Sequence, residues 1–537
     1  MMGKTLIFLA IISFASGARA QERNSLAAKI EEIVNQPQYR HASFGIEVLS
    51  LADGKIIYAR NAQKLFTPAS TTKLLTEGTA LELLGDNYRF HTRIYRTGPI
   101  DAQGTLHGDL ILVASGDPNL SGRIRPDGTL AFVAHGFDHT YGGSRYTKAV
   151  PGDPLLVIRQ LAKQVASRGI RRIDGEVLVD VSLFPEGERE LGTGVVISPI
   201  VVNDNLIDVT VTPGAQPGMP VKLDVSPATP YARFVNKAET GAAGSESSIS
   251  WTADEIQPDG SRVVTVGGTL PVGGRSILYS YPVPQPSRFA EMTLVQALRD
   301  DGVQADFAPY GRQVDFASLA RDYEPVNVVA EHISPPFSQE VKVTLKVSQN
   351  LHASMTIDLL GAIVAHAKTH VLQAGFDLEH NFLEKAGLDL TAASQSDGAG
   401  GDALFTPDFM CHYLAYMARR KDFANFENAL PILGRDGTLF NIQVDSPAAG
   451  HVFAKTGTIG GEDRLNHNMM ITGKGLAGYM DTANGQKDAI AIYANRVSLP
   501  LGGLNEIETT IGQTVGEIAS AIYESSGAQS ADAKHRK

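Results

Sequence analysis

The sequence predicts a multi-domain α/β protein in which two segments of helices and strands flank a β-rich region. The first observation is length, because 537 residues exceed one ordinary domain of roughly 100–200 residues. The second is periodicity, since both ends of the chain combine apolar residues at helical spacing with short alternating strands. The third is local composition: between about 94 and 324, glycines and prolines are frequent and the expected strands are short. This composition indicates one or two β-rich modules.

The composition is that of a globular chain. It is 43% hydrophobic and 20% charged, which argues against disorder throughout. The formal net charge is -11, from 47 basic and 58 acidic residues, which argues against a nucleic-acid partner because such proteins present a basic face. The single cysteine, Cys411, permits no intrachain disulfide and no cysteine metal cluster, and we expect it to be a small buried residue of a helix.

Residues 1–20 are predicted to be a secretory signal peptide. Lys4 precedes an apolar run from Leu6 to Ala15, and a small-x-small sequence ends the segment at Ala20. A buried helix or a membrane anchor is the alternative, but a run of about ten residues is well short of the roughly twenty that span a bilayer. We therefore expect an exported chain, periplasmic or secreted, without a transmembrane helix after cleavage.

The first helix-and-strand segment is predicted to open with a β-hairpin over 42–60. Apolar residues alternate on both sides of Asp53-Gly54, which is a typical turn sequence. A helix with a leucine stripe is expected to begin at Ser70 and to stop at Gly85.

The β-rich region contains few helical patterns. A helix is expected over 155–167 and a small, polar loop over 241–250. The candidate strands are 110–114, 175–179 and 206–211.

The last third returns to mixed helix and strand. Helical spacing from Ile357 to Val364 indicates a helix, and a second is expected over 405–420. The other predicted elements are a hairpin of strands 476–482 and 489–495, a closing core helix over 507–523, and a polar, disordered tail from Ser525.

Three short motifs occur in order along the chain. Each is weak alone, because such patterns arise by chance in a chain of this length. Each also lies in a suitable context, namely a helix start, a loop before a helix and the strand 451–458. The motifs are Ser70-Thr71-Thr72-Lys73, Ser348-Gln349-Asn350, and Lys455-Thr456-Gly457 followed by Thr458.

The spacing of the first motif suits nucleophilic catalysis. Ser70 and Lys73 lie about one helical turn apart on one face, so the lysine can reach the serine hydroxyl. Free N–H groups at the helix start can stabilise an oxyanion. A lysine with an ordinary pKa of about 10.4 is almost never neutral at pH 7, so its role as a base requires burial and a nearby cation to lower that pKa by about three units. Lys455 is the expected second cation.

The full pattern resembles the class C low-molecular-mass penicillin-binding proteins, the D-alanyl-D-alanine carboxypeptidase/endopeptidase family, over nearly the whole mature chain. One loop departs from the family pattern, because Ala399-Gly400-Gly401-Asp402-Ala403 replaces the usual serine-glycine-leucine-serine-arginine. Further matching segments are Gly116-Asp117-Pro118, Val201-Val202-Asn203-Asp204-Asn205, Ser396-Asp397-Gly398 and Asp436-Gly437-Thr438-Leu439.

The resemblance implies a penicillin-binding-protein/β-lactamase-like transpeptidase fold, in which an antiparallel sheet flanked by helices adjoins an all-helical region. It also implies that the catalytic serine peptidase domain is discontinuous. That domain is expected to comprise residues 21–93 and 325–537, with the β-rich region 94–324 inserted between them.

The same resemblance implies a role for each motif residue. The catalytic set is the acylated nucleophile Ser70, its base Lys73, and the cleft residues Ser348, Asn350 and Lys455. The substrate-binding set is Thr456, Gly457 and Thr458, whose threonines dock the terminal carboxylate. The implied substrates are peptidoglycan stem peptides ending in D-Ala-D-Ala, the implied covalent inhibitors are β-lactam antibiotics, and no cofactor or metal is expected.

Two other functions remain open at this point. A β-lactamase would use the same fold but needs a fast deacylation device, and the segment 427–431 breaks the usual glutamate pattern. A non-catalytic wall-binding protein would have no use for both motif lysines.

The sequence offers little rival chemistry. It contains no G-x-S-x-G elbow, no H-E-x-x-H and no Walker A loop. The fourteen histidines show no metal-ligand spacing, so His352, His412 and His467 are expected to be surface or core residues.

Overall fold

The structure, a computed structural model, describes residues 26–535. The predicted signal peptide at 1–20 lies outside the described residues. The described chain forms two compact units, one of residues 26–75 with 383–535 and one of residues 76–382, and the predicted insertion 94–324 falls inside the second. Within residues 26–535, no helix combines the length and the apolar composition needed to cross a bilayer.

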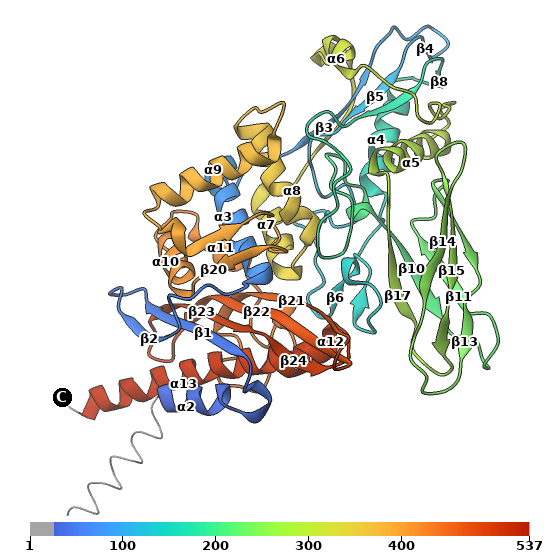
Figure 1. The fold of residues 1–537 in the computed structure, drawn as a ribbon. Coiled ribbons are helices and arrows are strands. Elements are labelled where there is room, and N and C mark those ends of the chain that lie inside the picture. Colours follow the sequence, from blue (N-terminus) through green and yellow to red (C-terminus); the bar gives the residue numbers. More distant parts are fainter. Residues whose placement is uncertain (1–25, 536–537) are drawn as a thin grey trace, which may run out of the picture. The chain divides into compact units, whose positions relative to one another are not determined.

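The first unit is built on a six-stranded antiparallel sheet (Figure 1). The strand order is β2-β1-β23-β22-β21, with β24 paired to β22. Both predicted hairpins are confirmed, as β1–β2 and β22–β23. The strands are β1 (Ser43–Ser50), β2 (Ile56–Arg60), β21 (Val452–Asp463), β22 (Asn468–Asp481), β23 (Lys487–Asn495) and β24 (Val497–Pro500).

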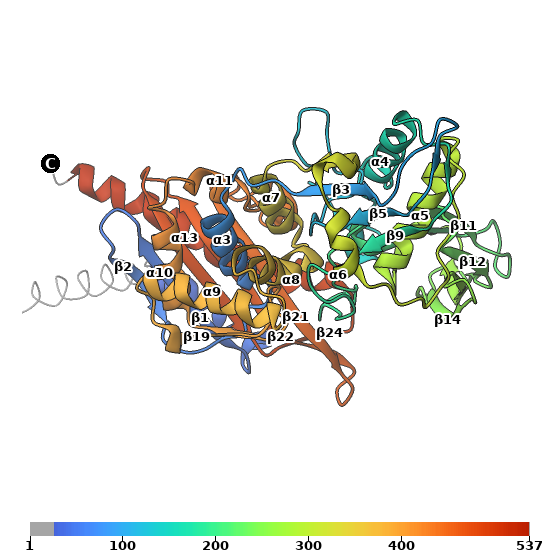
Figure 2. The same cartoon turned by 90° about the horizontal axis from the view of Figure 1, so that it is seen from above.

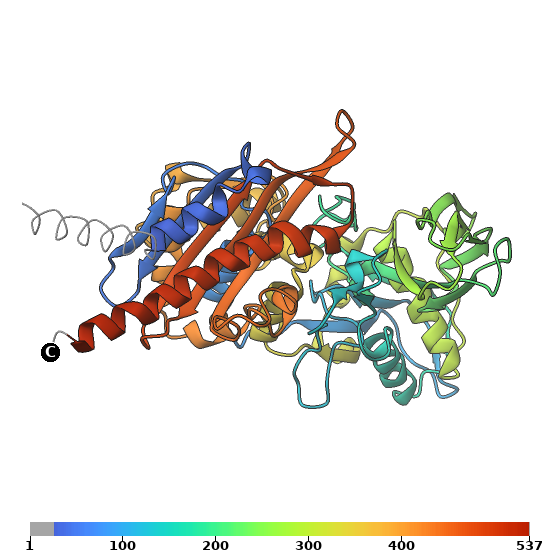
Figure 3. The ribbon, with the colours of Figure 1, turned by 90° about the horizontal axis from the view of Figure 1, so that it is seen from below.

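Helices cover both faces of this sheet. The helices α2 (Leu26–Val34) and α13 (Gln513–His535) lie side by side across one face (Figure 3). Ile46 and Val48 of β1 share a buried apolar cluster with Ile518 of α13. Residues between them on β1 face the opposite side, where α10 (Pro407–Met417) packs against β1 and β23.

The second unit contains a four-stranded sheet of order β18-β3-β5-β9. The helices α4 (Leu156–Ser167) and α5 (Pro286–Asp300) pack against one another and on this sheet (Figure 2). The strands predicted at 110–114 and 175–179 are confirmed, as β5 and β9. The sheet strands are β3 (His91–Arg96), β5 (Leu110–Val113), β9 (Val177–Asp180) and β18 (Val328–Ile333).

Two three-stranded sheets supply most of the remaining β structure of this unit. One has the order β11-β10-β17, and its central strand confirms the strand predicted at 206–211; the other has the order β12-β15-β14. The strands are β10 (Leu206–Thr212), β11 (Lys222–Ser226), β12 (Ala232–Asn236), β14 (Ser250–Ile256), β15 (Arg262–Gly267) and β17 (Ile277–Pro282).

The remaining elements are short strands and helices. The short strands are β4 (Thr105–Leu106), β6 (Phe137–Asp138), β7 (Thr147–Lys148), β8 (Arg172–Ile173), β13 (Glu239–Gly241), β16 (Thr269–Pro271), β19 (Ala393–Gln395) and β20 (Ala403–Phe405). The helices are α3 (Lys73–Leu84), α6 (Phe316–Leu319), α7 (Phe337–Val347), α8 (Asn350–Leu359), α9 (Val371–Lys385), α11 (Phe423–Asn428) and α12 (Leu504–Ile507).

Several elements differ from the sequence predictions, and the helices α2, α7 and α9 were not predicted. The helix α5 was not predicted, because it is buried on nearly every side and therefore lacks a one-sided apolar stripe. The disordered tail expected from Ser525 is wrong as far as residue 535, since α13 continues to His535. Extending an existing helix through alanine and glutamine costs far less than nucleating a new one.

Replacing Ile518 by alanine tests whether the closing helix belongs to the core. Ile518 is fully buried, so the change should lower the free energy of unfolding by about 2–5 kcal/mol. Glu517, its exposed neighbour on α13, supplies the control E517A, for which we expect a change within about 0.5 kcal/mol. Urea denaturation measures both, and equal effects of the two substitutions would contradict this packing.

Candidate active site

Ser70 lies in a tight turn that leads directly into a helix. The turn is the 3₁₀-helix η2 (Ala69–Thr72), and α3 follows from Lys73, so the predicted helix begins with a 3₁₀ turn. The hydroxyls of the two threonines hold this turn by donating to backbone carbonyls: Thr71 Oγ1 to Pro68 O at 3.0 Å, and Thr72 Oγ1 to Ala69 O at 2.9 Å.

Lys73 is in hydrogen-bond contact with the serine hydroxyl. Its Nζ donates to Ser70 Oγ at 2.8 Å and lies 3.4 Å from the carbonyl oxygen of Ala399. The lysine is fully buried. The loop that departs from the family pattern therefore supplies an acceptor for this amine. The distance of 2.8 Å to the serine is one at which an amine can exchange a proton with a hydroxyl.

Lys455 is a second fully buried lysine of the same unit. Its Nζ donates to the carbonyl oxygen of Thr456 at 2.7 Å. Burial holds the pKa of Lys455 well below its ordinary value, and repulsion from the Lys73 and Lys474 ammonium groups lowers that pKa further. The predicted second cation is thus within electrostatic reach of Lys73.

Gly457 lets the third motif approach the turn that carries Ser70. A Cβ atom at this position would lie 2.3 Å from Pro68 O and 3.0 Å from Ser70 N. No side chain fits there without displacing the backbone of Ser70. The structure thus brings the first and third motifs together.

The two threonines of the third motif have polar partners. Thr456 Oγ1 donates to Thr438 Oγ1 at 2.7 Å. Thr458 Oγ1 accepts from Lys474 Nζ at 2.8 Å, and Lys474 is paired with Glu508.

Sequence reasoning missed Lys474 and Glu508. Lys474 lies directly opposite Thr458 in the β21–β22 pairing, but the predicted strand began at residue 476 and β22 begins at Asn468. The signal available was a lone lysine within an apolar, glycine-rich stretch.

Ser348, Gln349 and Asn350 belong to the second unit, where they join two helices. Ser348 ends α7 in a left-handed conformation with φ of 62°, and Asn350 begins α8. The side chain of Gln349 accepts a hydrogen bond from Leu351 N at 3.0 Å and so caps α8. Gln349, the middle residue of the motif, therefore stabilises the start of α8.

Tyr141 holds both ends of this motif. Its hydroxyl donates to Ser348 O at 2.5 Å and to Asn350 Oδ1 at 3.3 Å. Burial raises the pKa of Tyr141, so the phenol keeps the proton that it donates. Gly192 lies against the same side chain, because a Cβ there would be 2.0 Å from Asn350 Nδ2.

His352, in the first turn of α8, belongs to a buried network of charged residues. His352 Nε2 is 3.0 Å from Asp204 Oδ1, and His352 Nδ1 is 2.9 Å from Glu340 Oε1. Arg123 and His139 join this network through Asp204, Asp138 joins it through Arg123, and Asp208 joins it through His139. His352 is fully buried, so of the two expected positions, surface or core, it occupies the core.

The comparisons with known proteins identify the family. Residues 26–508 match the D-Ala-D-Ala carboxypeptidase 3 (S13) family, so the chain belongs to it. The chain is a serine peptidase of the D-Ala-D-Ala carboxypeptidase class, and the family predicted from the three motifs is confirmed.

The similar proteins extend over most of the chain. A D-alanyl-D-alanine carboxypeptidase from Actinomadura sp. (strain R39) is 28% identical over 474 residues, which cover 84% of this chain and 79% of that protein. The D-alanyl-D-alanine carboxypeptidase DacB of Haemophilus influenzae is 24% identical over 470 residues, covering 85% and 86%. The crystal structure of penicillin-binding protein 4 from Haemophilus influenzae superposes with a TM-score of 0.69 at 21% identity, covering 93% and 99%, and confirms the predicted fold.

The substitution G457A tests the close approach of β21 to Ser70. The added methyl group must displace the turn that carries Ser70, so we expect the rate of acylation of the protein by a fluorescent penicillin to fall by about 10²-fold. Gly461 lies on the same strand, where an added methyl group would enter open space, so G461A is the matched control. A G457A protein that reacts as fast as G461A would show that the contact is unimportant.

The substitution H352Q tests the buried network through pH. Burial alone would lower the pKa of His352, but Glu340 and Asp204 outweigh it and raise the pKa from its ordinary 6.5 to about 10. Because the folded pKa is the higher one, the stabilisation is complete below pH 6.5 and is lost as pH rises through 10.

We therefore expect wild type to exceed H352Q in free energy of unfolding by about 3–5 kcal/mol at pH ~6, with the difference shrinking towards pH ~10. Urea denaturation across this pH range measures it, and the exposed His380 supplies the control H380Q. A difference between wild type and H352Q that stays constant with pH would contradict the ionised network.

Proposed function

We propose that Ser70 is the acylated nucleophile of a D-Ala-D-Ala carboxypeptidase or endopeptidase that acts on peptidoglycan stem peptides. The observation that carries this assignment is the 2.8 Å contact between Lys73 Nζ and Ser70 Oγ. A buried amine at that distance can remove the hydroxyl proton as the oxygen attacks a carbonyl carbon.

The chemistry proceeds in two steps. Ser70 Oγ bonds to the carbonyl carbon of the penultimate D-alanine, and its proton passes to Lys73 and then to the leaving amine. Water subsequently attacks the ester, and the reverse proton transfer frees the serine. Repulsion between the buried ammonium groups of Lys73 and Lys455 favours loss of one proton from the pair, which leaves an amine able to act as a base.

The other motif residues have proposed roles in binding and proton transfer. The buried charge of Lys455 and the nearby hydroxyls of Thr456 and Thr458 suit a terminal carboxylate. Gly457 lets β21 lie against the turn that carries Ser70, and we assign the backbone of this strand to substrate binding. We assign Ser348 to the proton relay and Asn350 to the peptide backbone of the substrate.

The same nucleophile accounts for inhibition by β-lactam antibiotics. A strained lactam carbonyl presents Ser70 with the electrophile of the normal substrate, and the opened ring stays attached as an ester. The proposed location of the enzyme is the periplasm or the cell exterior, where cross-linked peptidoglycan is found.

The substitution S70A tests the nucleophile. Removing the hydroxyl should abolish covalent labelling by a fluorescent penicillin and lower D-alanine release from a pentapeptide by at least about 10³-fold. Ser498, an exposed serine of β24, supplies the control S498A, which should be labelled like wild type. Persistent labelling of S70A would refute the assignment.

A second assay separates the two peptidase activities. The purified enzyme is incubated with a disaccharide-pentapeptide and with its cross-linked dimer, and the products are identified by mass spectrometry. Release of D-alanine indicates carboxypeptidase action, and conversion of dimer to monomers indicates endopeptidase action. Failure to cleave either substrate, with penicillin labelling intact, would contradict the proposed substrate class.

A further inference from the structure

Glu47 is a buried carboxylate that the peptidase chemistry does not use. Its residue is fully buried, and within the described part of the chain neither carboxylate oxygen has a hydrogen-bond partner. Burying a charged carboxylate without a partner is costly, so such groups are normally paired, protonated or bound to a metal ion. The groups that lie beside Glu47 must therefore explain how its carboxylate is accommodated.

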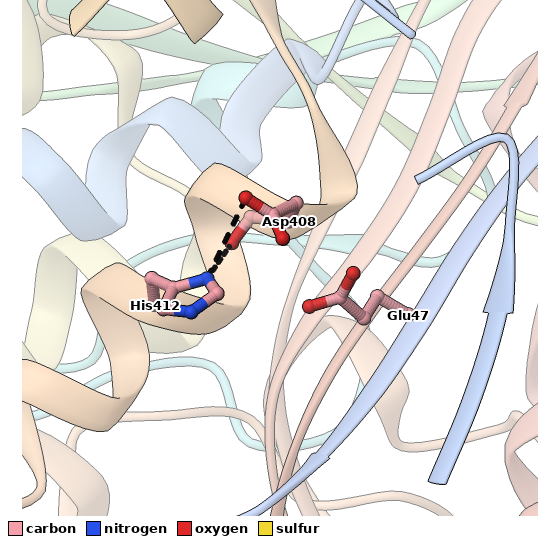
Figure 4. Close-up of side chains that lie close together, drawn as sticks. All are labelled: Glu47, Asp408 and His412. Atoms are coloured by element: carbon pink, nitrogen blue, oxygen red, sulfur yellow. Dashed lines mark hydrogen bonds and ion pairs between the residues drawn. The ribbon is translucent and has the colours of Figure 1, made fainter. Parts of the chain in front are cut away.

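The sheet itself supplies no partner among the described residues. Glu47 lies on β1 between β2 and β23, and the residues directly opposite it are Ala59 and Ala491, which carry only methyl groups. Its side chain projects from the face of the sheet against which α10 packs. There it points toward Asp408 and His412 of that helix (Figure 4).

Asp408 and His412 present two further ligand atoms to the same point. They are four residues apart on α10, so both side chains project from one face of the helix. One ligand atom from each of Glu47, Asp408 and His412 lies within 4.8 Å of the other two. His412 Nδ1 is 2.9 Å from the carbonyl oxygen of Asp408. The same nitrogen is 3.6 Å from Asp408 Oδ2, and in metal sites a hydrogen bond from one ring nitrogen of a histidine fixes which nitrogen offers its lone pair to the ion.

We propose that Glu47, Asp408 and His412 form a binding site for a divalent transition-metal ion, with Zn²⁺ as its representative. Two carboxylates balance the charge of the ion, and a mixed oxygen and nitrogen donor set suits zinc. Bonds of about 2.1 Å place tetrahedral ligand atoms about 3.4 Å apart, so the three side chains close slightly around the ion. The side chain of His412 is half exposed, which leaves a path for the ion and a fourth position for water.

The electrostatics of the site favour a cation. Burial raises the pKa of Glu47 to about 7, and repulsion from Asp408 adds to this effect while His412 opposes it. A divalent ion relieves both the burial of the charge and the repulsion between the carboxylates. Cys411, the neighbouring residue on α10, is directed at the sheet backbone instead, with Sγ 3.5 Å from Glu47 O, so it is not part of the donor set.

This proposal revises the expectation for His412, for which the sequence shows no metal-ligand spacing. Asp408 and His412 are close in sequence, but the third ligand lies on a strand roughly 360 residues earlier, so no local motif reveals it. The ion would tie α10 to β1, and the serine chemistry does not depend on it.

Calorimetric titration of Zn²⁺ into the metal-stripped chain tests the proposal. The protein carries no histidine tag, because a tag would itself bind zinc. We expect one saturable site in wild type and an affinity at least about tenfold weaker in E47Q and in H412A. Glu462, an exposed residue of β21, supplies the control E462Q, which should bind zinc like wild type.

A spectroscopic readout identifies the ligands independently of stability. Co²⁺ bound by four ligands should give visible absorption bands in wild type that are absent in E47Q. Penicillin labelling of Ser70 shows whether each variant is folded. If E47Q does not fold, H412A still tests the proposal, because the side chain of His412 is half exposed and its loss should leave the fold intact. Absence of a saturable Zn²⁺ site, or equal binding by wild type and E47Q, would overturn the proposal. The buried Glu47 would then be explained by protonation of its carboxyl group or by a trapped water molecule.

Discussion

The contact between a buried amine and a serine hydroxyl is the interaction on which the rest of the first unit depends. Lys73 reaches Ser70 only because a 3₁₀ turn precedes α3, and that turn is held by the hydroxyls of its own threonines. Burying two lysines in one unit is unfavourable unless their protonation changes, and the low pKa of Lys455 shows this cost. In the mechanism proposed above, the repulsion between these buried lysines favours a neutral amine that can act as the base.

The second unit holds its own motif by different means. Ser348 has a left-handed backbone, which a residue other than glycine adopts only when its surroundings impose it. Tyr141, the cap from Gln349 and the ion pairs of His352 supply those constraints. Removing one member of such a buried ion pair is costly because it leaves the other charge unpaired, so the pairs favour one arrangement of the motif.

The sequence predicted what depends on local pattern. The two hairpins, α4 and the closing helix follow from periodicity and turn residues, and the three motifs identified the family. It did not predict α5, which is buried on nearly every side, or the pairing of Lys474 with Thr458, which depends on strand register. Asp204, which pairs with His352, and the two residues that face Glu47 lie far away along the chain, so only the fold reveals them.

The most direct test of the contact between Lys73 and Ser70 is the rate at which K73M is acylated by penicillin, followed by intact-protein mass spectrometry. Methionine keeps most of the length of the side chain and removes the amine. Loss of a general base lowers such a rate by about 10²–10⁴-fold, and we expect a fall of this size, with K64M, at an exposed lysine, reacting like wild type. Equal acylation rates for K73M and wild type would show that another group accepts the proton from Ser70.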